Sequence, residues 1–80
     1  MSYYKTLITY MQPNHEYSFD EILNIFVHYH TFRSNYVFSI GSKKSYIISA
    51  LKKAIDNDKV IKIEQPGART KYTDHYYKLL

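Results

Sequence analysis

Residues 42–57 are divided more sharply into an apolar and a polar face than any other stretch of this chain. At 100° of rotation per residue, the apolar side chains fall within about 120° of one another. They are Ile47, Ile48, Leu51, Ala54 and Ile55. The opposite face carries Ser42, Ser45, Tyr46, Ser49, Lys52, Lys53 and Asp56. This spacing predicts an amphipathic helix that starts after an N-cap at Ser42 and ends near Asn57.

Two further helices are predicted before this one. Residues 2–11 carry apolar side chains at helical spacing, and Pro13 ends that helix because proline lacks a backbone donor. Ser18 and Glu21 then form a capping box, in which each side chain accepts the backbone N–H of the other residue. We therefore expect a second helix from Phe19 to about His30.

The remaining segments predict a hairpin and one long connection. Lys59 to Glu64 is rich in β-branched residues and reads as a strand. A second strand is expected over Tyr76 to Leu79, with a start as early as Lys71 left open. Tyr17 is expected to make a single bridge of strand. Residues 31–41 connect the second and third helices, and their apolar part is expected to pack on the core.

Composition supports one small globular domain over residues 1–80. The chain has 80 residues, of which 45% are hydrophobic, so it can form a core and is not predicted to be disordered. It has no cysteine, which excludes disulfides and thiolate zinc sites. We find no membrane-span pattern and no signal peptide. We therefore expect an intracellular protein, in a prokaryotic or host cytoplasm or in a nucleus.

The order of helix, helix, helix and hairpin predicts an α+β winged-helix fold, whose hairpin forms the wing. The charged residues are distributed unevenly between the two halves of the chain. Residues 1–41 have two basic and three acidic residues, whereas residues 42–80 have nine basic and four acidic residues. Residues 1–41 thus carry a net charge of −1 and residues 42–80 a net charge of +5, so the whole positive surplus lies in the half with the third helix and the hairpin. A clustered positive charge is typical of a polyanion partner, and a solvated basic face is the alternative.

One stretch resembles a known family. The sequence Ile47-Ile-Ser-Ala-Leu-Lys52, followed by Ile55 and Val60, resembles the third helix and first wing strand of the linker-histone globular domain. Gly67-Ala68 falls at the spacing of that family's glycine-alanine pair, and residues 77–79 resemble its closing strand. The resemblance implies a winged helix with a general DNA-binding surface. Of the family's DNA-contacting lysines, only Lys52 carries over.

The predicted function is binding to double-stranded DNA, as in a transcriptional regulator or an architectural chromatin protein. The third helix would enter the major groove, and the hairpin would contact the backbone. The candidate DNA-binding residues are Lys43, Lys44, Ser45, Tyr46, Ser49, Lys52, Lys53, Arg69 and Lys71. Tyr46 is expected to face away from the core, where it could stack on a base or sugar.

Catalytic and metal-binding patterns are lacking in this sequence. It has no Gly-x-Ser-x-Gly motif and no phosphate-binding glycine loop, and nothing adjacent activates a tyrosine nucleophile. His28 and His30 point about 200° apart on a helix and cannot share a metal. All four histidines are expected at the surface or at helix ends. We therefore predict no enzyme activity, no cofactor, no metal and no small-molecule substrate.

A second hypothesis stays open. The same winged helix could serve as a protein-interaction module without DNA binding, such as an adaptor or inhibitor. Such a protein could be viral, because the chain is so compact. Exposed tyrosines, including Tyr46 and Tyr72, would then be anchors in a protein interface. A homodimer through the first helix or through residues 36–40 is also left open.

Overall fold

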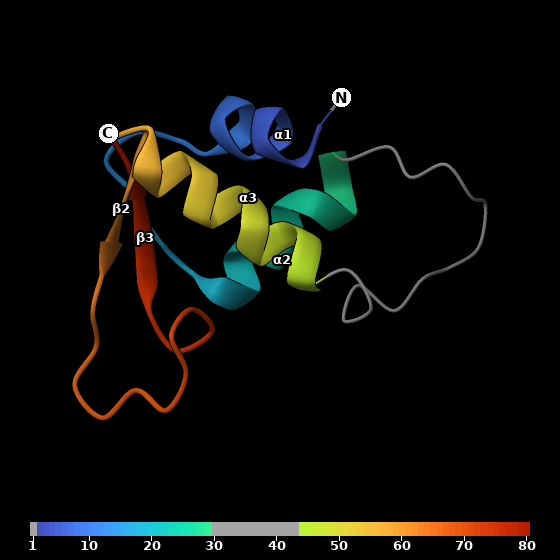
Figure 1. Ribbon diagram of the computed structural model, residues 1–80. Helices are drawn as coiled ribbons and strands as arrows, with labels where there is room; N and C mark the ends of the chain where they lie inside the picture. The colour runs from blue at the N-terminus through green and yellow to red at the C-terminus, as the bar shows by residue number, and fades with distance from the viewer. Residues whose placement is uncertain (1, 30–43) are drawn as a thin grey trace.

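The computed structural model describes residues 2–29 and 44–80, shown in colour in Figure 1. Its elements follow the chain as α1 (Tyr3–Tyr10), β1 (Glu16–Ser18), α2 (Phe19–Tyr29), α3 (Lys44–Asp56), β2 (Val60–Ile63) and β3 (Tyr76–Leu79). The described residues therefore form a small α+β fold with three helices and one three-stranded antiparallel sheet. The predicted helix end at His30, the packing of residues 36–40, the N-cap at Ser42 and the candidate Lys43 lie outside the described residues.

Both N-terminal helices begin at a cap that the sequence supplies. The Ser2 hydroxyl accepts the Lys5 N–H at 3.1 Å at the start of α1. At the start of α2, Ser18 Oγ accepts the Glu21 N–H at 3.2 Å, while Glu21 Oε1 accepts the Ser18 N–H at 3.1 Å. The predicted capping box is thus confirmed, and it fixes the start of α2 directly after β1.

The sheet is larger than the sequence predicted. Its strand order is β1-β3-β2, so the last strand of the chain lies between the other two. Tyr17 pairs with Tyr77 as part of a three-residue strand, and the prediction of a single bridge was therefore too short. On the other side, Lys62 also lies opposite Tyr77. The full extent of β1 could not be predicted because three residues are too few to show an alternation of apolar and polar side chains.

The second strand of the hairpin was predicted at its observed bounds, and the first was predicted one residue too long at each end. The earlier start at Lys71, which the sequence left open, does not occur. The structure keeps Tyr76–Leu79 as β3, and residues 71–75 form turns and bends instead of strand. Before β2, Asp58 adopts the left-handed φ of 57°. The Lys59 N–H then bonds the Ala54 carbonyl at 2.9 Å, which closes the predicted turn between α3 and β2.

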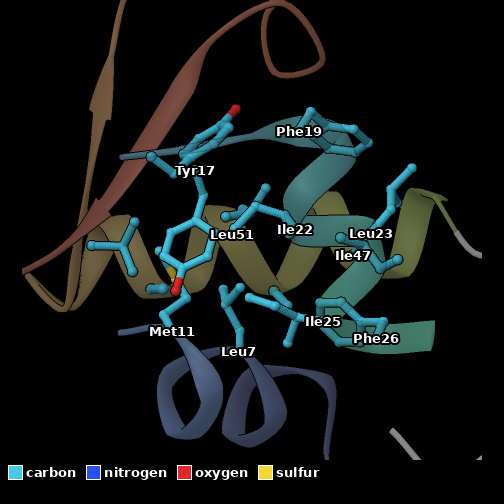
Figure 2. Close-up of a cluster of buried hydrophobic side chains, with 14 residues drawn as sticks. Leu7, Met11, Tyr17, Phe19, Ile22, Leu23, Ile25, Phe26, Ile47 and Leu51 are labelled. Carbon is cyan, nitrogen blue, oxygen red and sulfur yellow. The ribbon is translucent and has the colours of Figure 1, made fainter. Parts of the chain in front are cut away.

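The core lies where the helices meet the inner face of the sheet. Figure 2 shows side chains from α1, α2, α3 and β1 converging there. Fully enclosed members include Leu7, Ile22, Phe26, Leu51 and Tyr77. The predicted apolar face of α3 is confirmed in its buried part, Ile47, Leu51 and Ala54, while Ile48 and Ile55 are only partly buried. With that face directed inward, the opposite face of α3 is directed outward.

Candidate nucleic-acid interface

One line of exposed side chains runs along the outer face of α3. Ser45, Ser49, Lys52 and Asp56 recur at intervals of four, three and four residues, and all four are exposed. At this spacing they lie within about 60° of one another, opposite the buried face. The side chains are small in the first half of the helix and charged in the second half. Such a surface can approach another molecule closely and can donate hydrogen bonds to it.

Tyr46 and Lys53 occupy the edge of this face that lies against α1. The Tyr46 ring stacks on the Tyr3 ring, with a centroid distance of 5.5 Å and an angle of 18° between planes. Lys53 Nζ lies over the Tyr4 ring at 4.8 Å from its centroid. Tyr46 therefore faces away from the core, as expected, and its ring also stacks on a tyrosine of α1, which was not expected. Its side chain is nevertheless 55% exposed, so part of it borders the outer face of α3.

Lys44 is the first described residue of α3 and is exposed on the other edge of the same face. It lies nearly in line with Ile48 and Ile55, which are partly buried. The outer face of α3 is thus bordered by a lysine on one side and by Tyr46 with Lys53 on the other.

The loop between β2 and β3, residues 64–75, is held in shape by its own side chains. Asp74 Oδ2 accepts the backbone N–H groups of Arg69 at 2.8 Å and Thr70 at 3.0 Å. The Thr73 N–H donates to Thr70 Oγ1 at 3.1 Å, and the two threonine hydroxyls also share a hydrogen bond. The backbone donors of Arg69 and Thr70 keep the pKa of the Asp74 carboxyl below its usual value.

The side chain of Lys62, on β2, contacts the part of this loop that contains Lys71 and Tyr72. Its Nζ donates to the Lys71 carbonyl at 3.2 Å, lies 5.3 Å from the centroid of the Tyr72 ring, and is 3.7 Å from Glu64 Oε1. This lysine partly offsets the negative charge of Glu64 at the start of the loop. The side chains of Arg69 and Lys71 stay exposed on this structured loop.

His75 contradicts the expectation that every histidine lies at the surface or at a helix end. It is 7% exposed, and its Nδ1 accepts the Gln65 N–H at 3.0 Å. The ring therefore joins the two ends of the loop. His15 is exposed and bonds Glu21 at 3.0 Å. Within residues 2–29 and 44–80, no group of three or more potential ligands is placed to hold a metal ion.

The described residues also line a shallow, open depression beside α2, with a volume of about 210 Å³. Its walls are Tyr17, Glu21, Asn24, Ile25, His28 and Tyr29. Glu21 is engaged by His15 and by the capping box, and these hydrogen bonds hold its pKa below the usual value. The Glu21 carboxylate is thus engaged in hydrogen bonds that hold the start of α2.

Sequence reasoning therefore located the exposed residues but missed those that position them. Asp74 and Lys62 hold the loop in shape, and neither was singled out as a site residue. The run of hydroxyl and carboxylate residues in Thr70-Lys-Tyr-Thr-Asp74 was the available signal, because such side chains commonly bond nearby backbone groups.

Comparison of the chain with protein-family models, with curated proteins and with solved structures finds no match. Among the helices of the described residues, none has the length and apolar character needed to span a bilayer. The function must accordingly be argued from the surfaces of this chain alone.

Proposed function

We propose that this chain is a winged-helix protein that binds double-stranded DNA. The order α1-β1-α2-α3-β2-β3, with β3 between β1 and β2, is compatible with that fold. In this assignment α3 is the recognition helix, and the loop of residues 64–75 is the wing. The chemistry of the two surfaces is the main support for a DNA partner.

The observation that carries the proposal is the pairing of two features. The outer face of α3 has small hydroxyl side chains at Ser45 and Ser49 followed by Lys52, and its one acidic residue, Asp56, lies at the last turn. After α3 and β2 comes the loop of residues 64–75, which exposes Arg69 and Lys71 and whose backbone is fixed by Asp74. Small polar side chains permit close approach to base edges, and a preformed loop loses little conformational entropy on binding.

Each candidate residue then has a distinct role in the proposed complex. Ser45 and Ser49 would contact base edges or phosphates in the major groove, and Lys52 would neutralise a phosphate. Lys43, Lys44 and Lys53 would contact phosphates on either side of the helix, and Arg69 and Lys71 would follow the adjacent backbone. The half-exposed Tyr46 ring, supported by Tyr3, would pack on a sugar or base.

The test is binding to random-sequence duplex DNA, followed by fluorescence anisotropy over a series of salt concentrations. If about four to six phosphates are neutralised, the slope of log affinity against log salt is expected near −4 to −5. An affinity that barely changes with salt would contradict this mechanism. Binding to no duplex at low salt would favour the second candidate.

That second candidate is a protein-interaction module of the same fold, and Tyr46 is the observation that favours it. A ring that is 55% exposed yet held by stacking on Tyr3 is preorganised as an interface anchor. The two proposals differ in the residues whose removal should matter most. Tyr46→Ala should abolish binding to a protein partner, whereas Lys52→Ala with Lys53→Ala should weaken binding to all DNA sequences alike.

A further inference from the structure

The outward face of the sheet carries an apolar patch that the proposed DNA interface does not use. Tyr17, Val60 and Tyr77 are buried, so the alternate positions of all three strands point away from the core. Ile61 and Tyr76 are each 40% exposed there, and Leu80, just beyond β3, is 66% exposed. In Figure 1 the three helices lie to the right of β2 and β3, and the exposed fractions of Ile61, Tyr76 and Leu80 indicate that the described residues leave this outward face open.

The strand register arranges this face in two parallel rows. The first row runs across the sheet through Glu16, Lys78 and Ile61. The second row runs through Ser18, Tyr76 and Ile63. Each row therefore has a polar residue on β1, a long side chain on β3 and an isoleucine on β2.

The two rows are complementary to each other. In a face-to-face pair related by a two-fold axis across the strands, row one of each copy lies over row two of the other. Ile61 would then meet Ile63 of the second copy, the Lys78 ammonium would meet the face of its Tyr76 ring, and Glu16 would accept from its Ser18 hydroxyl. Every contact occurs twice, as a two-fold interface requires.

We propose that two copies of this chain form a homodimer through the outward faces of their sheets, with Ile61 of each copy packed against Ile63 of the other. A second copy is favoured over an unrelated partner because the patch supplies both members of each contact. The surface differs from α1 and from residues 36–40, which the sequence left open as dimer contacts. It also contains none of the candidate DNA-binding residues.

Sedimentation velocity over a range of protein concentrations tests the proposal without DNA. The mass should rise from one chain to two as concentration increases, and Ile61→Glu should weaken the dimer at least tenfold. The matched control is Val27→Glu, because Val27 is 53% exposed on α2 and lies away from the sheet. A single-chain mass at every concentration would overturn the proposal, as would equal dimer strength in the two variants or a loss confined to the Val27 variant.

A crosslinking experiment tests whether Ile61 of one copy faces Ile63 of the other. Because the natural chain has no cysteine, only the introduced cysteines can form disulfides. Chains with Ile61→Cys are mixed with chains with Ile63→Cys and oxidised. Random pairing of equal amounts of the two chains gives the mixed disulfide at about twice the yield of each self-disulfide, and the proposed dimer should exceed that ratio clearly because only unlike positions face each other. A ratio of two or less would overturn the proposed pairing. Circular dichroism of every variant verifies that the chain remains folded.

Discussion

The hydroxyl of Tyr77 donates a hydrogen bond of 2.5 Å to the backbone carbonyl of Tyr72. The Tyr77 side chain is fully buried in the core, whereas Tyr72 belongs to the loop between β2 and β3. One side chain thus connects the packing of the core to the shape of the loop. Burial raises the pKa of the Tyr77 phenol, so the hydroxyl remains a donor throughout the physiological pH range.

Replacing Tyr77 by Phe should loosen the loop while leaving the core packed. The ring stays in place, but the Tyr72 carbonyl loses its donor, and the free energy of unfolding should fall by about 1 kcal/mol. Urea denaturation measures this change, and amide hydrogen exchange should accelerate in residues 69–74. Tyr76→Phe is the control, because Tyr76 lies on the opposite face of the sheet and should change neither quantity. Equal effects of the two substitutions would refute the link.

Replacing Asp74 by Ala should release the loop backbone and weaken DNA binding severalfold with little change in overall stability. The Arg69 and Thr70 N–H groups would lose their shared acceptor, so the loop would have to be ordered on binding. Anisotropy measures the affinity, and thermal unfolding measures the stability. Asp74→Asn should retain much of the affinity because an amide oxygen can still accept. Unchanged affinity in the alanine variant would show that the loop takes no part.

Low pH should release the backbone of the loop between β2 and β3 as the Asp74 carboxylate becomes protonated. The folded-state pKa of Asp74 lies below its usual value of 3.8, so the stabilisation is fully present above that pH. It is lost as the pH falls through the lower, folded-state pKa. The Arg69 and Thr70 amide resonances should therefore titrate together with a midpoint below 3.8 in NMR spectra. A midpoint above that value would be incompatible with these hydrogen bonds.

Glu21 should contribute to acid sensitivity in the same direction. The hydrogen bond from His15 and the backbone donor at Ser18 hold its folded-state pKa below the usual 4.5. Its stabilisation is present above that pH and is lost as the pH falls through the folded pKa. The stability of Glu21→Gln should thus vary less below pH 4.5 than that of the natural chain. Acid titration followed by circular dichroism compares the two, and identical curves would count against the capping role.

Two lysines should differ in their effect on the salt dependence of DNA binding. Lys52→Ala should bring the slope of log affinity against log salt closer to zero by about 1, because one phosphate contact is lost. Lys5→Ala should leave the slope unchanged, since Lys5 is exposed on α1, outside the proposed interface. Anisotropy at several salt concentrations measures both. A matching change in the Lys5 variant would indicate attraction by net charge alone.

The helices and the two hairpin strands could be predicted because their signals are local. Ser18 and Glu21 act within one helical turn, and Ile47, Leu51 and Ala54 repeat at the helical period. The pairing of Tyr17 with Tyr77 could not be predicted in this way. It joins positions sixty residues apart, and three strand residues show no periodicity of their own.

The candidate site was predicted as a set of exposed residues but not as an arrangement. Periodicity indicated that Tyr46 and Lys53 lie outside the core, yet it could not show that Tyr3 and Tyr4 from α1 would lie against them. The burial of His75 was missed for a similar reason. Its acceptor role depends on a turn that brings Gln65 back to it, and that turn is set by the whole loop.

The central position of β3 has a consequence for how the chain acquires its structure during synthesis. Both neighbours of β3 are made before it, and neither has a strand partner until Tyr76–Leu79 has left the ribosome. The sheet therefore forms in one late step, after the helices are available to collapse. A nascent chain stalled before residue 76 would hold β1 and β2 as unpaired edges, so release of the last strand is the event that commits the domain to its fold.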